Sequence, residues 1–417
     1  MRFPFAFSRP LARSQLSARD RGSAQRHVGV GVLLSGTFLM NLGFNILVPL
    51  LAIHFTANLG FTAAAIGLVL ALRQFAQQSL DLFSGILGDR IGARTSIAAG
   101  CLIRAVGFLG IGYSHTLAEL LWWALVAGVG GAFFDAPGTA ALADLVAPEQ
   151  HQRAFAASAT CGNLGAAIGP LIGVALLGDG FGVVGVVAAL CFAVLGLLTL
   201  ALLPGFALRG AAPEGQAREA EMRLGATLRL LWRDKTFLWL TVLLSGFWFI
   251  WAQINITVPL AAARLGGAPL AALALSVNAG LAIVLQYPLS QLAGRHWTLP
   301  RLLVICTAVS AVGMALVFAL PLVATLFAGI VVFALGRMVM GPVINSATAA
   351  LAPAGKFGAY FGFGALAIAV GASGGQLAGG ALYDVARRLD LPVLLWGSML
   401  LAGVVVMLGL ARLRLPE

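Results

Sequence analysis

Charge is what this sequence has least of. Only 10% of its 417 residues are charged, whereas 60% are hydrophobic. An average soluble domain has about 25% charged residues, because its surface must face water. The composition therefore excludes a soluble globular protein and predicts a chain whose main surroundings are a lipid bilayer. The 52 glycines agree, since glycine is frequent in membrane helices and lets them approach closely.

Patterns that would hold a metal or perform catalysis are also lacking. The four cysteines stand far apart inside apolar runs, and the five histidines include no pair four residues apart. No nucleophile and base occur in a recognisable arrangement. We therefore expect no metal, no cofactor and no enzymatic activity. The net charge of +11 lies mostly in short segments between apolar runs, which argues against nucleic-acid binding.

The first 27 residues contain six arginines and no apolar core. A secretory signal needs an apolar stretch of about 7–15 residues. We therefore expect residues 1–27 to form a loose cytoplasmic tail.

Apolar runs long enough to cross a membrane occur twelve times, counting about 20 residues for each crossing. They lie at 29–51, 64–84, 95–113, 117–141, 154–178, 183–203, 237–260, 270–292, 300–319, 322–350, 357–382 and 391–411. The fold class predicted is an all-α membrane protein. Its expected parts are a six-helix bundle at 28–204, a cytoplasmic loop at 205–236, a second bundle at 237–411 and a short cytoplasmic tail at 412–417.

Two further patterns support this organisation. Most arginines and lysines fall in loops on one side of the predicted membrane, which places both termini in the cytoplasm. The two halves also repeat each other: Pro137 and Pro148 in the fourth helix match Pro342 and Pro353 in the tenth, at the same separation. Such duplication predicts two pseudo-symmetric six-helix bundles around a site at the membrane midplane, which is typical of secondary transporters.

The turn between the second and third helices reads G-I-L-G-D-R-I-G-A-R over residues 85–94. Its glycines, acid and arginines are Gly85, Asp89, Arg90, Gly92 and Arg94. This turn resembles the signature of the major facilitator superfamily, except that Ala93 replaces a basic residue. The resemblance implies a latch between the two halves, joined by Asp144 at the end of the fourth helix. The alternative is a turn whose charges only set the topology.

The fifth helix carries spaced small residues, which could serve only helix packing. They are Gly165, Gly169, Pro170 and Gly173. The segment is similar to the antiporter signature of the same superfamily, which implies export by exchange. With L-R-Q-F-A-Q-Q, R-A-V-G-F and F-D-A-P in helices two to four, residues 30–410 resemble its drug:proton antiporters, which implies multidrug efflux driven by protons. The basic residue that many of them carry early in the fourth helix is absent, and Leu125 stands there.

Ionisable groups inside a bilayer are costly and are functional candidates by default. A rise of about 1.5 Å per residue puts Asp81 about 8 Å, Asp135 about 10 Å and Arg104 about 14 Å from the cytoplasmic edge. We expect these three to form one cluster for proton coupling, with Asp135 as the carrier. Arg73, at about 20 Å on the same count, is expected to stand apart. In the alternative, Arg104 only neutralises Asp135.

Helices one, four, seven and ten line the centre in the family that this chain resembles. That placement implies a substrate cavity with polar and aromatic wall residues. The candidates are Asn41, Asn45, Arg73, Gln77, Trp248, Trp251, Gln253, Asn255, Tyr287 and Arg337. Trp248 and Trp251 could instead face lipid or lie at the membrane interface.

The function predicted is proton-coupled export of amphipathic, drug-like molecules by alternating access, from a monomer in the bacterial inner membrane. The expected partners are the small-molecule substrate, protons and the lipid bilayer. An alternative keeps the fold and changes the cargo to a siderophore, a sugar or a lipid. A membrane receptor that transports nothing is a further alternative, against which the intramembrane charges and the duplicated halves weigh.

Overall fold

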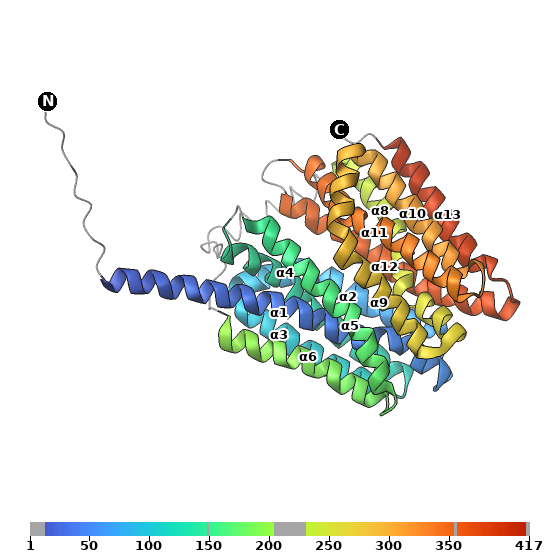
Figure 1. The fold of residues 1–417 in the computed structure, drawn as a ribbon, viewed down its shortest axis with the longest axis horizontal. Helices are drawn as coiled ribbons and strands as arrows, with labels where there is room; N and C mark the ends of the chain where they lie inside the picture. Colours follow the sequence, from blue (N-terminus) through green and yellow to red (C-terminus); the bar gives the residue numbers. More distant parts are fainter. Residues whose placement is uncertain (1–12, 148–149, 204–230, 354–356, 414–417) are drawn as a thin grey trace.

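The computed structural model describes residues 13–147, 150–203, 231–353 and 357–413 (Figure 1). The helices of the first half are α1 (Arg13–Ala57), α2 (Ala63–Ile91), α3 (Ala93–Gly112), α4 (Leu117–Leu145), α5 (His151–Leu177) and α6 (Phe181–Leu202). Each contains one predicted span. The helix α1 begins well before the predicted span at 29–51, so part of the expected loose tail is helical. The expected loop at 205–236 lies almost entirely outside the described residues.

The second half consists of α8 (Lys235–Ala252), η2 (Gln253–Asn255), α9 (Thr257–His296), α10 (Leu299–Ala319), α11 (Val323–Leu351), α12 (Phe357–Leu389) and α13 (Val393–Arg412). The predicted seventh span, 237–260, is not one straight helix. It comprises α8, the short 3₁₀ turn η2 and the first residues of α9. The chain then turns back inside α9, where Gly266 and Gly267 leave helical geometry; Gly267 has φ 72°, which costs glycine little.

Ten stretches of the described chain are long and apolar enough to cross a membrane. One of them, Lys235–His296, contains the reversal at Gly266–Gly267 and so supplies two crossings. The helix α2 is not among the ten, because Arg73, Gln74, Gln77, Gln78 and Asp81 interrupt its apolar character. Twelve crossing helices result, and the predicted all-α membrane fold is confirmed.

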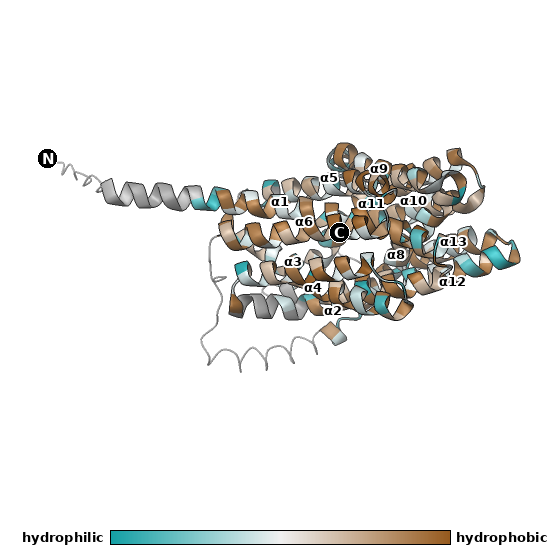
Figure 2. Ribbon diagram, turned by 90° about the horizontal axis from the view of Figure 1, so that it is seen from below, coloured by the Kyte–Doolittle hydropathy of each residue, from teal (hydrophilic) through white to brown (hydrophobic). Residues whose placement is uncertain are grey.

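The surface of the helices is apolar, as lipid contact requires. Figure 2 shows hydrophobic residues along the outer faces of both halves. Large apolar side chains such as Val284 (70% exposed), Leu401 (67%) and Leu197 (60%) would be costly in water. In a bilayer they face lipid tails, so the exposed surface is a membrane surface.

Glycines let paired helices of each half approach closely, and they do so in the same way in both halves. A Cβ on Gly107 of α3 would lie 2.6 Å from the backbone nitrogen of Ala127 in α4. In the second half, Gly313 of α10 packs against the backbone of Phe333 in α11 in the same manner. The shared packing supports the duplication that the sequence predicts.

The two halves contact each other most closely at the end of the molecule away from the chain termini. There the start of α2 packs on the end of α12: Gly67 lies against the Gln376 carbonyl, and Gly380 against the Ala63 carbonyl. The carboxylate of Asp384 accepts hydrogen bonds from the backbone N–H groups of Ala63 (3.0 Å) and Ala64 (2.8 Å). Toward the termini the halves diverge (Figure 1). The chain is thus closed at the end where α12 terminates.

Candidate functional site

Three neighbouring cavities lie near the centre of the molecule and toward the termini. The first, of about 280 Å³, lies in the first half and is bordered by Asp135, Thr37 and Ser158. The second, of about 400 Å³, shares Thr37 and Ser158 with the first and reaches Arg337 in the second half. The third, of about 530 Å³, lies between α5 and α9 and includes Tyr287. Together they place an acid, a cation and an aromatic ring around connected space.

Asp135 is the acid of this region, and its partner is an amide. The Nε2 atom of Gln77 donates a hydrogen bond of 2.6 Å to Oδ2 of Asp135. Pro137, which lies inside α4, follows two residues later. Asp135 is half-buried and borders the first cavity, so a proton or a substrate that enters this cavity can reach its carboxyl group.

Two arginines lie beside this acid, and both lie over the same ring. The guanidinium carbon of Arg73 is 4.8 Å from the centre of the Phe44 ring, and that of Arg104 is 5.7 Å from it. Arg104 also lies over Phe108 (5.5 Å) and Phe192 (5.2 Å). Cation–π contacts of this kind stabilise a cation that has left water. Among the described residues no direct ion pair joins Arg104 to Asp135.

The expectation that Arg73 stands apart is wrong. Its Nη1 atom donates to Oε1 of Gln77 at 2.9 Å, and Gln77 in turn donates to Asp135. A second bond of 3.0 Å joins Arg73 to Gln74. The count of helix rise gave depth only, and a long side chain spans the remaining separation. Arg73 is therefore a buried member of the cluster and does not border the three cavities.

Asp81 occupies a different position on the same helix. It is half-buried, its Oδ1 atom has no hydrogen-bond partner, and its electrostatic neighbours are Asp135 and Arg104. The expected cluster of Asp81, Asp135 and Arg104 thus lies within one electrostatic environment. Of the two acids, only Asp135 borders one of the three cavities described above.

The predicted wall residues divide into two groups. Asn41, Tyr287 and Arg337 border the central cavities. Asn45 instead donates to the Asn41 carbonyl (2.8 Å) and packs against Gly169.

The residues predicted on the seventh helix do not border these cavities. Trp248 and Trp251 contact each other, with ring centres 5.3 Å apart, and pack on the apolar core. Gln253 is fully buried and donates to the Gly375 carbonyl of α12 at 2.9 Å. Asn255 is buried in η2. Gln253 and Asn255 lie in the break between α8 and α9, and there Gln253 is hydrogen-bonded to α12 and not directed into a cavity.

The turn predicted as a latch is only partly described. Residues 85–90 belong to the end of α2, but the side chains of Gly85, Asp89 and Arg90 lie outside the described residues. Gly92 has φ 86° and permits the sharp start of α3. Arg94 donates to the Leu200 carbonyl at the end of α6, and Asp144 is exposed. The latch remains a prediction.

The small residues of the fifth helix pack α5 on α1. A Cβ on Gly165 would lie 2.5 Å from the Phe38 carbonyl oxygen, and one on Gly169 would lie 2.9 Å from that of Leu42. Gly173 lies against the Ile46 carbonyl, and Pro170 is buried between them. The geometry accounts for these residues by packing, and their link to exchange remains a prediction.

We expect Gly173→Ala to lower the thermal unfolding midpoint of the purified protein by a few degrees, because an added methyl group must displace the α1 backbone and overpacking costs about 1–3 kcal/mol. Gly178→Ala is the matched control, since a Cβ added at Gly178 would meet nothing within 4 Å. Unfolding is followed by tryptophan fluorescence in one detergent. Equal midpoints for the two variants would contradict this packing.

Sequence reasoning missed three residues that join the halves. Asp384 caps α2 from the end of α12, just beyond the predicted span at 357–382. The amide of Asn163 donates to Oε1 of Gln286 across the centre at 3.3 Å. The available signal was a helix start at Ala63 whose N–H groups needed an acceptor. Its partner is more than 300 residues away in the sequence, which no local pattern indicates.

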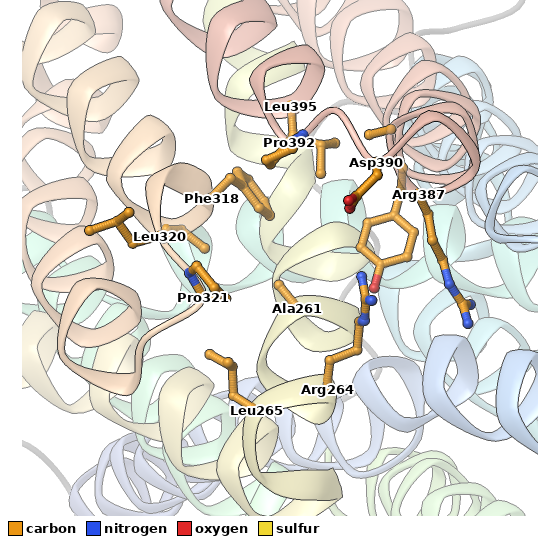
Figure 3. A pocket seen from close by; sticks show the side chains of 13 residues that line it. Ala261, Arg264, Leu265, Phe318, Leu320, Pro321, Arg387, Asp390, Pro392 and Leu395 are labelled. Atoms are coloured by element: carbon orange, nitrogen blue, oxygen red, sulfur yellow. The ribbon is translucent and has the colours of Figure 1, made fainter.

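A separate cavity of about 410 Å³ lies at the closed end, within the second half (Figure 3). Arg264 and Tyr383 both line it, and the Arg264 side chain donates a hydrogen bond to that of Tyr383. Arg387 and Asp390 lie on its rim. Tyr383 is adjacent to Asp384 in the chain, so this cavity borders the contact that closes the molecule. None of the residues that line it lines the three central cavities.

Twelve membrane helices in two similar halves, closed at one end, with charged groups around cavities between them, define a membrane transporter. The chain belongs to the major facilitator superfamily, whose family model matches residues 33–376. It is accordingly a transporter and not an enzyme, and a small-molecule substrate follows from the family.

Curated relatives agree with this assignment. The chain is 32% identical over 396 residues to the multidrug resistance protein MdtH of Escherichia coli O157:H7, covering 94% of this chain and 95% of the relative. The same identity and coverage hold for MdtH of Escherichia coli strain K12 / DH10B and of Shigella boydii serotype 18. The resemblance to multidrug transporters of this superfamily is thereby confirmed.

Solved structures share the fold at low sequence identity. A POT family transporter in complex with 5-aminolevulinic acid has a TM-score of 0.75 and 16% identity, over 92% of this chain and 94% of that one. A mutant of the nucleoside transporter NupG has a TM-score of 0.75 and 16% identity, over 91% and 99%. The human organic anion transporter MFSD10 has a TM-score of 0.64 and 17% identity, over 91% and 99%.

Proposed function

We propose that this protein exports amphipathic, drug-like molecules in exchange for protons. The observation that carries the proposal is Asp135, a titratable group that borders a central cavity and is held by Gln77. The name of the MdtH relatives, multidrug resistance protein, supports drug-like cargo. A proton on Asp135 and a substrate in the adjoining cavities are close enough to influence each other, which is what exchange requires.

The sidedness follows from the distribution of charge. The basic loops favour both termini in the cytoplasm of a bacterial inner membrane, and the protein acts as a monomer. In this orientation the described conformation is closed toward the outside, and its cavities face the cytoplasm. A conformation open to the outside must break the contacts of α2 with α12.

Reconstituted vesicles test both direction and energy source. We expect ethidium, as a probe, to accumulate against its gradient only while a proton gradient is imposed, and the accumulation to collapse when a protonophore is added. Vesicles with the Gln77→Leu variant, which lacks the hydrogen bond to Asp135, serve as the comparison. Uphill transport that persists without a proton gradient would exclude the antiport reaction and leave another energy source.

A different cargo is distinguished in the same vesicles. Uphill, gradient-dependent transport of a sugar or a siderophore with no transport of ethidium would retain the proton coupling and replace the multidrug assignment. Failure to transport any of these compounds would exclude all three as cargo.

A further inference from the structure

Arg337 of α11 is a cation in the central region that has no anionic partner within the part of the chain that the structure describes. It borders the 400 Å³ cavity, and its Nε atom is buried without a hydrogen-bond partner. No charged neighbour among the described residues acts on it electrostatically. Arg73 and Arg104 differ in this respect, because Asp135 acts on both. A cation removed from water without a counter-charge is costly, so its retention needs a reason.

The second half cannot supply the missing anion from within the membrane. The sequences of α8, α9, α10, α11 and α13 contain no aspartate or glutamate. The acid of α12 is Asp384, which is engaged with the start of α2 at the closed end. Two acids within the predicted spans of the first half, Asp81 and Asp135, lie among the arginines of that half.

The groups around Arg337 are suited to a polar, negatively charged portion of a ligand. Its cavity is bordered by side chains that carry amides or hydroxyls and by no other charge: Thr37, Asn41, Ser158, Asn163 and Gln286. A guanidinium matches the two oxygens of a carboxylate or the oxygens of a sulfonate. An organic anion placed here would therefore satisfy the cation.

The adjoining cavity provides space for the rest of such a molecule. This 530 Å³ cavity shares Asn163 and Gln286 with the 400 Å³ cavity, and Ile283, Tyr287 and Pro342 add apolar and aromatic surface. Arg295 lies on its border and carries a second positive charge. A ligand with an anionic group at Arg337 and an aromatic body beside Tyr287 fits the chemistry of both cavities.

We propose that Arg337 binds the anionic group of the cargo, so that the transported molecules include aromatic carboxylates or sulfonates, with or without a cationic group elsewhere. This inference rests on the proposed function and narrows its substrate class. Arg337 acts as a determinant of specificity by favouring charged over neutral versions of one molecule.

A matched pair of probes tests the inference at equilibrium, in detergent and without any gradient. The probes are 2-naphthoate and 2-naphthamide, which share the ring system and differ in charge. Equilibrium dialysis of the full-length protein should show at least about tenfold tighter binding of the carboxylate, the value expected for one charge-assisted contact. Arg337→Gln should remove this preference and leave naphthamide binding unchanged, and Arg337→Lys should retain part of it.

Arg264→Gln is the control, because it removes a cation at the closed end and should keep the preference. Equal binding of both probes by the unaltered protein, or binding of neither, overturns the inference, and this comparison needs no variant. An equal loss of both probes in a folded Arg337→Gln protein would indicate a structural role instead. Because no proton gradient is involved, failed antiport with a retained anion preference would reject the proposed function alone.

Discussion

Asp135→Asn is expected to abolish uphill export and to leave substrate binding intact. Asparagine keeps the size of the side chain and a hydrogen-bond acceptor for Gln77, which lies 2.6 Å away, but it cannot exchange a proton. Binding depends on the cavities, whereas coupling depends on the titratable group. Accumulation of the probe in vesicles should therefore fall to the level of protein-free vesicles, while its dissociation constant in detergent changes less than about threefold.

Asp81→Asn is the matched control on the neighbouring helix and should be milder. Asp81 has the same chemistry and shares Arg104 with Asp135 as an electrostatic neighbour, but it does not line the cavity that Asp135 lines. The deciding measurement is proton release when substrate is added to the solubilised protein. If the Asp135→Asn variant released protons fully and the Asp81→Asn variant released none, Asp81 and not Asp135 would be the proton carrier.

Asp384→Ala is expected to shift the protein toward the conformation that is open at the end away from the termini. The carboxylate accepts two backbone N–H groups at the start of α2, where the helix dipole also favours an anion. We expect the substitution to lower the stability of the closed conformation, relative to the open one, by about 1–2 kcal/mol. This is less than the sum for two fully buried charge-assisted hydrogen bonds, because Asp384 is half-buried. The ratio of open to closed molecules should rise by roughly 5- to 30-fold.

Pulsed electron resonance between spin labels at Leu59 and Leu389 measures this shift, since both positions are exposed at the closed end. The labels require a background without the four native cysteines. Asp179→Ala removes an exposed acid at the same end and should leave the distance distribution unchanged. An unchanged distribution in Asp384→Ala as well would show that the glycine contacts alone hold this end closed.

The sequence predicts the fold well because each element leaves a local signal. A membrane span is an uninterrupted apolar run, and duplication leaves matched prolines such as Pro137 and Pro342. The sequence also identifies Asp81, Arg104 and Asp135 as candidates, because a charged residue is conspicuous within an apolar run. The break after Ala252 leaves a weaker signal, since the polar pair Gln253 and Asn255 fits a cavity wall as well as a helix interruption.

Contacts between distant residues could not be predicted in this way. The approach of Arg73 to Asp135 depends on Gln77 and on the close packing of α2 with α4, where Gly128 lies on the Arg73 backbone. The pairing of Asp384 with Ala63 depends on how the two halves meet. Helix periodicity determines which residues share a face, but it does not determine which helix that face meets.

The seam between α2 and α12 has a consequence for how often the transporter can cycle. Where Gly67 meets the Gln376 carbonyl and Gly380 meets that of Ala63, the surfaces in contact are main chain, which is already ordered within each helix. An interface of long side chains would lose rotamer freedom at every closure, up to about 2 kcal/mol for each residue. Here little such freedom is lost or regained, so closing and separating the seam resembles the docking of two rigid bodies. Its breakage is then governed mainly by the contacts themselves. The carboxylate of Asp384 adds two hydrogen bonds to them, so we expect it to lengthen the time that the closed state lasts.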